Sequence, residues 1–208
     1  MIDKKVFLRG VFVNYGQLIV AFVLNFVLTP LMLRHLGQAG YGVWAAFSSI
    51  MTYFVLFDFG LNTAVAKYTA EYRAAEKRDK ISAMASTTLL IFGAVALLVL
   101  LASVIIVCFI NDIFGIPAEL GSPAKTAFVV MGMNVALMMV AGVFGNILYG
   151  FQRVDIWKAS SIVQLLTNAL LVILFLKFGF GLVGVAAASM MSSVLLTYLY
   201  LHFIRRGK

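Results

Sequence analysis

The amino-acid sequence predicts an all-α membrane protein with six transmembrane helices in one domain, residues 1–208. Six long apolar stretches, separated by short charged joints, fill nearly the whole chain. Each stretch approaches or exceeds the roughly 20 residues that a helix needs to cross a hydrocarbon core of about 30 Å. Only helices and closed barrels satisfy their own backbone hydrogen bonds in lipid, and barrel strands alternate apolar with polar residues. Runs such as LLIFGAVALLVLLASVIIVCFI do not alternate, which leaves helices.

Composition and charge distribution favour a membrane over water or nucleic acid as the environment. The chain is 63% hydrophobic and 12% charged, whereas a soluble domain carries about 25% charged residues. A net charge of +8 would suit nucleic-acid binding, but thirteen of the sixteen basic residues fall in the segments on one side of the predicted membrane. This asymmetry follows the positive-inside rule, so we expect both termini in the cytoplasm and no nucleic-acid partner.

The first two helices are expected over about 10–36 and 41–66. Pro30 lies in the last turns of the first helix and predicts a kink there. The joint between the two helices is short and rich in glycine. The second helix is expected to continue into the cytoplasm over 67–80, because the segment KYTAEYRAAEKRDK consists largely of good helix formers.

The remaining four helices are expected over about 82–110, 126–149, 156–176 and 181–203. A loop punctuated by glycine and proline, NDIFGIPAELGSPAK, separates the third from the fourth. The last two are joined by KFGFG, a connection so short that these helices must be antiparallel neighbours.

Asp58 is the single acidic residue inside a predicted span. It lies about 12 Å from the inner end of the second helix at 1.5 Å per residue. A carboxylate at that depth is costly and by default a functional candidate that faces a cavity or a partner. Asn62 lies one turn further on the same face, and Lys67 could extend to the membrane surface. The alternative is an acid that a neighbouring polar group satisfies and that has no role in transport.

Other polar residues suggest a seam through the predicted bundle. Asn14 and Asn25 are eleven positions apart and share a face of the first helix. Further amides lie within the first, fourth and fifth spans: Gln17, Asn134, Asn146, Gln164 and Asn168. Together they are consistent with a hydrated central groove, although each alone could be an interhelical hydrogen bond worth about 1 kcal/mol. Arg34 and Arg153, which lie in joints at opposite membrane surfaces, complete the candidates for substrate or ion coupling.

No catalytic, metal or cofactor site is predicted. His35 and His202 fall on opposite sides of the membrane, so they cannot share a metal ion. No serine–histidine or cysteine–histidine arrangement and no glycine-rich phosphate loop is present, and the single cysteine, Cys108, excludes an internal disulfide. An enzyme is therefore disfavoured.

Four motifs give the chain a family resemblance over nearly its whole length. LRHLGQAGYGVWA, LFDFGLNTAVAKYTAEY, LYGFQRVDIWKAS and GFGLVGVAAASMMSSVL follow one another in this order. In order and spacing they resemble the amino-terminal lobe of bacterial polysaccharide flippases, which belong to the multidrug, oligosaccharidyl-lipid and polysaccharide exporter superfamily. One departure is that such cavities are expected to be cationic, whereas the deepest charge here is Asp58.

The resemblance implies one six-helix lobe of a two-lobed exporter in the bacterial inner membrane. Such exporters pass lipid-linked oligosaccharide, for example a lipopolysaccharide precursor, to the outer leaflet by alternating access. The partner would be the missing second six-helix lobe or a second copy of the chain in a homodimer. Two alternatives stay open: a cation-coupled multidrug exporter of the same superfamily, and a membrane scaffold or assembly subunit that transports nothing.

Overall fold

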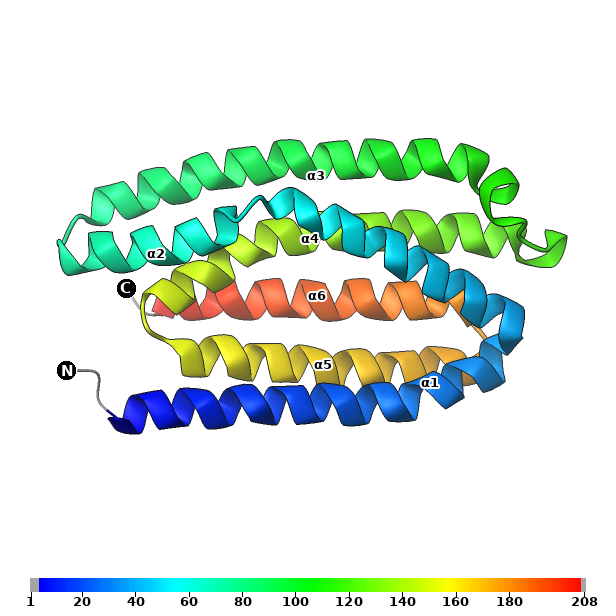
Figure 1. Ribbon diagram of the computed structural model, residues 1–208, viewed down its shortest axis with the longest axis horizontal. Helices are drawn as coiled ribbons and strands as arrows, with labels where there is room; N and C mark the ends of the chain where they lie inside the picture. Colours follow the sequence, from blue (N-terminus) through cyan, green and yellow to red (C-terminus); the bar gives the residue numbers. More distant parts are fainter. Residues whose placement is uncertain (1–3, 207–208) are drawn as a thin grey trace.

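The computed structural model describes the backbone of residues 4–206 and the side chains from Tyr15 onward, except those of residues 112 and 118. Every regular element in that part of the chain is helical, as the sequence predicts, and the helices lie side by side in an elongated bundle (Figure 1). The elements are α1 (Lys4–Val55), the 3-10 turn η1 (Leu56–Asp58), α2 (Leu61–Ala74), α3 (Arg78–Phe114), the 3-10 turn η2 (Ala118–Leu120), α4 (Gly121–Gly150), α5 (Val154–Lys177) and α6 (Gly181–Arg206).

Helix α1 combines the first expected helix and most of the second. Its 52 residues would extend about 78 Å at 1.5 Å per residue, more than twice the thickness of a hydrocarbon core. The helix bends sharply instead (Figure 1). Helical geometry is broken at Gly37, whose dihedral angles of 71° and 175° are essentially restricted to glycine. Residues 4–36 and 38–55 are therefore two segments that α1 joins. Pro30 lies inside the helix, and the kink expected there stays a prediction.

Within the described part of the chain, five helices are long and apolar enough to cross a membrane: α1, α3, α4, α5 and α6. Because α1 holds two segments and counts once, this number is compatible with the six apolar stretches of the sequence. The expectation that the second helix runs unbroken from 41 to 66 is wrong, however. The chain leaves helical geometry after Val55, and Phe59 and Gly60 both take left-handed conformations, with φ of 46° and 76°, before α2 begins.

Other expected boundaries also shift. Helix α2 ends at Ala74, so the expected helical extension over 67–80 is wrong beyond that residue, and 78–80 already form the first turn of α3. Helix α4 begins at Gly121 rather than near 126. It takes in Pro123, because a proline in the first turn lacks only an N–H group that would have no helical partner. Helices α5 and α6 begin and end within three residues of expectation.

Helix α4 is the centre of the lobe and contacts α1, α2, α3, α5 and α6. Glycines make these contacts close: a methyl group added at Gly132, Gly145 or Gly150 would come within 3.0 Å of a neighbouring helix. The obstructing residues are, in the same order, Ser103 of α3, Tyr200 of α6 and Thr69 of α2. Small residues at such crossings let helix backbones approach and gain van der Waals contact, which drives helix association in lipid.

We expect Gly150→Ala to destabilise the lobe. The new methyl group would lie 2.7 Å from the backbone oxygen of Ala66, which cannot move without shifting α2. Overpacking of this kind costs about 1–3 kcal/mol. The matched control is Gly93→Ala on α3, where nothing lies within 4 Å. Thermal unfolding of the purified chain in detergent should show a lower melting temperature for Gly150→Ala alone. Equal melting temperatures would contradict the close packing of α2 on α4.

The basic residues are expected to mark the cytoplasmic end of the bundle. The start of α1, the turn from α2 to α3, the joint from α4 to α5 and the end of α6 lie at the same end of the molecule (Figure 1). Of the fifteen lysines and arginines within residues 4–206, the segments there carry twelve.

We predict that a membrane-impermeant maleimide added to intact cells labels Gln38→Cys and leaves Lys77→Cys unlabelled. The Cys108→Ser background removes the exposed native thiol. Permeabilised cells should label both variants, which controls for reactivity. Labelling of the residue 77 variant alone in intact cells would invert the topology.

Candidate functional site

The break between α1 and α2 places Asp58 at the start of α2. Its Oδ1 accepts a hydrogen bond of 3.1 Å from the backbone N–H of Asn62. From two residues before the N-cap Gly60, this carboxylate accepts from a first-turn N–H that has no helical partner, and it is favoured by the partial positive charge of the helix amino terminus. The expectation of an acid inside a continuous helix is therefore corrected: Asp58 is half-buried at an interruption, with a backbone group as its partner.

The side chain of Asn62 contacts α4 rather than Asp58. Asn146 on α4 donates through Nδ2 to Asn62 Oδ1 at 2.9 Å and to the Gly142 carbonyl oxygen at 2.8 Å. Gly142 leaves room for this pair, because a methyl group added there would lie 3.0 Å from Asn62 Oδ1. Two amides that the sequence places on different helices are thus joined across the α2–α4 interface.

A cavity of about 310 Å³ lies next to this amide pair, between α1, α4, α5 and α6. Its size falls at the lower end of the range for ligand pockets, roughly 300–1,000 Å³. Amide, hydroxyl and indole groups line part of it: Gln17, Asn146, Trp157, Ser161, Gln164 and Tyr200. Met138, Ala141, Gly142, Leu165 and Leu196 supply the rest of the wall. Among the side chains that the structure describes, the lining carries no carboxylate, ammonium or guanidinium group, so it suits an uncharged, hydrogen-bonding occupant.

Several lining groups already have protein partners. Ser161 Oγ donates to the Trp157 carbonyl oxygen at 3.0 Å and lies 3.4 Å from Tyr200 Oη. Gln164 Nε2 donates to Ser193 Oγ at 3.3 Å. The exception is Gln17, whose Oε1 is buried and has no hydrogen-bond partner among the side chains that the structure describes. An unsatisfied buried oxygen costs about 1–3 kcal/mol, so a donor that reached it from the cavity would be favoured.

The predicted pair Gln164 and Asn168 links α5 to α6. In addition to the bond from Gln164 to Ser193, Ser189 Oγ donates to Asn168 Oδ1 at 3.5 Å. Gln164 and Asn168 therefore make hydrogen bonds between helices, which was the alternative to a purely groove-lining role in the sequence analysis. Asn134 lies on α4, and its Oδ1 is buried without a partner.

Two further predicted site residues, Asn25 and Arg34, do not line the cavity. Asn25 is exposed and donates to the carbonyl oxygen of its own helix at Ala21, at 2.9 Å. Arg34 is exposed close to the bend of α1. The side chain of Asn14 lies outside the described residues, so the face that it was expected to share with Asn25 stays a prediction.

Lys67 and Arg153 lie at the end of the bundle where α4 ends. Lys67 is exposed, with its ammonium group 5.7 Å from the ring centre of Tyr68. Arg153 is half-buried immediately before α5, and its backbone N–H donates to the Leu148 carbonyl oxygen at 3.1 Å. The structure thus brings together Gln17, Asn62, Asn146 and Gln164 from the predicted seam and leaves these basic residues outside it.

The sequence analysis missed a second set of contacts between α2 and the carboxyl end of α4. The Arg73 guanidinium donates to the carbonyl oxygen of Phe151 and lies 5.5 Å from the ring centre of that residue. Asn62, Thr69 and Arg73 follow a helical spacing, so one face of α2 contacts α4 at three levels. This spacing could have been found in the sequence. Ser161 and Tyr200 gave no such signal, because serine and tyrosine occur on every kind of membrane helix surface.

Comparison with a protein family and a curated relative gives two findings. A family model described as "Polysaccharide biosynthesis protein" matches residues 7–208. The chain is also 22% identical over 199 residues to a Bacillus subtilis protein described as the uncharacterized membrane protein EpsK. That alignment covers 93% of this chain and 39% of the relative, so the chain spans about two fifths of the relative's length.

Two solved structures have the same fold as the chain. One is an outward-facing multidrug resistance MATE family transporter of the MOP superfamily, with a TM-score of 0.76 and 14% identity over 94% of this chain and 44% of that one. The other is a MOP superfamily transporter from Pyrococcus furiosus, described by a reverse polarity of its binding pocket that suggests a different function. Its TM-score is 0.71, with 16% identity over 94% of this chain and 42% of that one.

We expect the cap at Asp58 to tolerate asparagine and not alanine. Asparagine keeps an oxygen acceptor for the Asn62 N–H, whereas alanine leaves that N–H without a side-chain partner at a cost of about 1 kcal/mol. Melting temperatures of the purified variants should therefore fall in the order wild type, Asp58→Asn, Asp58→Ala, with the larger step at alanine. An Asp58→Ala variant as stable as wild type would contradict the capping role.

Proposed function

The chain belongs to the family of polysaccharide biosynthesis proteins, and on that premise we propose that it is one lobe of a flippase for lipid-linked oligosaccharide. The membrane-spanning, all-helical fold resembles that of MOP superfamily transporters, which supports transport as the activity. The proposed cargo carries a glycan on a lipid from the cytoplasmic to the outer leaflet of a bacterial plasma membrane. Alternating access of two lobes would move it.

The observation that carries the proposal is a cavity inside a membrane lobe whose wall combines apolar residues with six uncharged hydrogen-bonding side chains. Its amides and hydroxyls supply both hydrogen-bond donors and acceptors, and Gln17 Oε1 has no partner among the side chains that the structure describes. Glycans are rich in hydroxyl groups that both donate and accept, and they carry no charge of their own unless substituted. An amide-lined cavity favours such a cargo over the apolar cations that a multidrug exporter would carry. It also counts against a scaffold, whose buried polar groups would be expected to find partners within the bundle.

Two helix interruptions suggest how the lobe would change shape. The segment 38–55 lies between the bend at Gly37 and the break at Phe59 and Gly60. Helix α2 beyond the break is held to α4 by the Asn62–Asn146 pair and by Arg73. Changes in a few dihedral angles at the two interruptions would let 38–55 tilt while α2 and α4 stay together, as hinges do in other transporters.

Asp58 lies at the second of these interruptions. We propose that its charge matters for transport in addition to its role as a cap, because it is the one acid between the bend of α1 and the end of the 3-10 turn that follows it. Asp58→Asn keeps the cap and removes the charge. In the complete transporter it should reduce transport while the protein accumulates normally. Unchanged transport with unchanged abundance would limit Asp58 to its structural role.

A second lobe is part of the proposal, because the chain corresponds to 39–44% of the related proteins' lengths. Either a second six-helix lobe or a second copy of this chain would close the central pathway. We therefore expect the 208-residue chain to transport nothing as a monomer. Cysteine crosslinking of the chain expressed alone, together with a transport assay, distinguishes the cases. Transport by a chain that crosslinks to no partner would contradict the two-lobed mechanism.

Deletion of the coding sequence in its native host tests the proposed cargo. Lipid-linked oligosaccharide should accumulate in the inner leaflet and surface polysaccharide should fall, because the lipid carrier would be trapped on the cytoplasmic side. Extraction of the lipid fraction measures the accumulated lipid-linked oligosaccharide, and staining of the cell surface measures the polysaccharide.

Complementation with point variants then links the defect to the cavity. Asn146→Leu and Gln164→Leu should restore less surface polysaccharide than wild type at equal protein abundance, since each removes a lining amide. Cys108→Ser, which changes an exposed position on α3, is the matched control and should restore it fully. Normal polysaccharide in the deletion strain, without lipid-linked intermediates, would contradict the proposal.

A further inference from the structure

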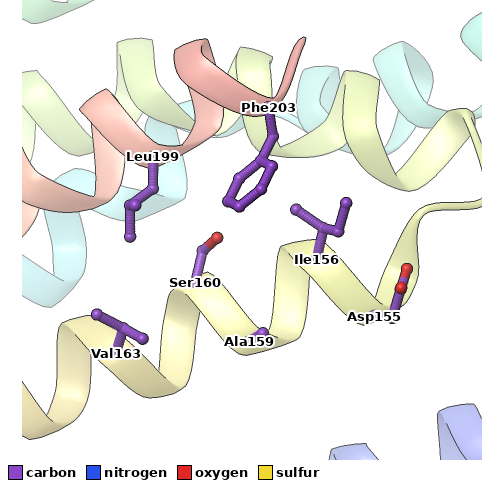
Figure 2. A pocket seen from close by; sticks show the side chains of 7 residues that line it. All are labelled: Asp155, Ile156, Ala159, Ser160, Val163, Leu199 and Phe203. Carbon is purple, nitrogen blue, oxygen red and sulfur yellow. The ribbon is translucent and has the colours of Figure 1, made fainter. Parts of the chain in front are cut away.

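A second hollow, separate from the polar cavity, lies between the start of α5 and the end of α6. This groove has a volume of about 340 Å³ and opens on the surface of the bundle (Figure 2). Helix α5 contributes Asp155, Ile156, Ala159, Ser160 and Val163, and α6 contributes Leu199 and Phe203. None of these residues lines the polar cavity, so the groove is a distinct feature of the lobe.

Ser160 gives the groove an unsatisfied polar group. The residue is 3% exposed, and its Oγ has no hydrogen-bond partner. The adjacent Ser161, by contrast, donates to the carbonyl oxygen four residues earlier in its own helix. Figure 2 shows the Ser160 hydroxyl directed from α5 toward the side of α6 that carries Leu199 and Phe203. Since an unpaired buried hydroxyl is costly, an occupant with an acceptor oxygen would be bound at this point once the side chains that cover Ser160 Oγ move aside.

Along the groove the lining changes from a charged group to a hydroxyl group and then to apolar side chains. Asp155, exposed in the first turn of α5, supplies a carboxylate at its mouth. Ser160 follows about 7.5 Å further along the helix and Val163 about 12 Å from Asp155, at 1.5 Å per residue. From Val163 to Leu174 the exposed residues of α5 are hydrocarbon alone, with Leu166, Leu170 and Leu174. A membrane lipid presents the same sequence of groups: a head group, then ester oxygens, then an acyl chain.

We propose that the groove binds one phospholipid with an ethanolamine head group. The ammonium group would pair with the Asp155 carboxylate, an ester carbonyl would accept from Ser160 Oγ, and an acyl chain would lie along Ala159, Val163 and Leu199. Charge complementarity selects this lipid. Asp155 is the one charged residue among those that line the groove, so an anionic phosphatidylglycerol, or the pyrophosphate of a lipid-linked glycan, would bring negative charge against it. Lys158, one turn further along α5, has its ammonium group 4.4 Å from the ring centre of Trp157, which lines the other cavity. A choline head group offers no N–H donor, whereas a primary ammonium group offers three.

The bound lipid would stabilise the folded lobe, because a ligand that binds only the native state raises its stability. It would fill the gap between α5 and α6 at the end where both the joint from α4 and the end of α6 lie. This inference does not depend on the identity of the transported cargo.

Titration of the delipidated chain in dodecyl maltoside with dioleoyl lipids tests the site. Native mass spectrometry should show one tightly held phosphatidylethanolamine, and the melting temperature should rise more with this lipid than with phosphatidylcholine or phosphatidylglycerol. Asp155→Asn should weaken phosphatidylethanolamine binding roughly tenfold, the scale of a lost charge-assisted hydrogen bond, and remove the preference over phosphatidylcholine. Asp79→Asn is the matched control, because it removes the acid from the first turn of α3 outside the groove.

A second pair of variants tests the acyl-chain position. Ala159→Phe fills the groove from an exposed position and should abolish the tight site, whereas Leu170→Phe, further along the same exposed face of α5, should leave it intact. Equal binding of the three lipids, an unaltered preference in Asp155→Asn, or a tight site that survives Ala159→Phe would each overturn the proposal. Displacement of phosphatidylethanolamine by a polyprenyl pyrophosphate would also overturn it, since the groove would then hold cargo.

Discussion

The close approach of neighbouring helices to α4 is the constraint on which the rest of the lobe depends. Lipid is as apolar as the helix surfaces, so helices associate in it through van der Waals contact and hydrogen bonds rather than through the hydrophobic effect. Gly132, Gly145 and Gly150 bring α3, α6 and α2 against α4 at distances that no larger residue would permit. The central helix can then contact every other long helix of the lobe.

The same close packing builds the polar features. Gly142 lets Asn62 and Asn146 bond across the α2–α4 interface, and Gly145 faces Trp157 and Tyr200, two residues that line the polar cavity. Amides that would be costly in hydrocarbon are therefore collected where backbones lie close and lipid is excluded. The close helix contacts and the buried polar groups both depend on the glycines of α4. A substitution that separates the helices should therefore weaken the packing and disrupt the polar contacts.

The sequence predicts the helical class and the positions of most helices, because an apolar run long enough to cross the hydrocarbon core indicates a membrane-spanning helix. It does not predict the break after Val55, since the apolar run continues through LFDFG and composition alone favours one helix. The Asp58 and Gly60 pair was the available signal: an acid suited to cap a helix, followed by a glycine suited to a positive φ. Asn146 and Gln164 were recognised as polar, but their partners depend on helix rotation, which an apolar sequence leaves almost unspecified.

The central claim is that α4 and its neighbours form a cavity within the membrane that amide and hydroxyl groups line in part. Cysteine accessibility to a small charged methanethiosulfonate tests it most directly, in the Cys108→Ser background with reagent added to inverted and to intact vesicles. The account predicts that Ser161→Cys and Gln164→Cys react from at least one side. Leu166→Cys, on the exposed apolar face of α5, should not react. Cavity positions as unreactive as Leu166→Cys would contradict it.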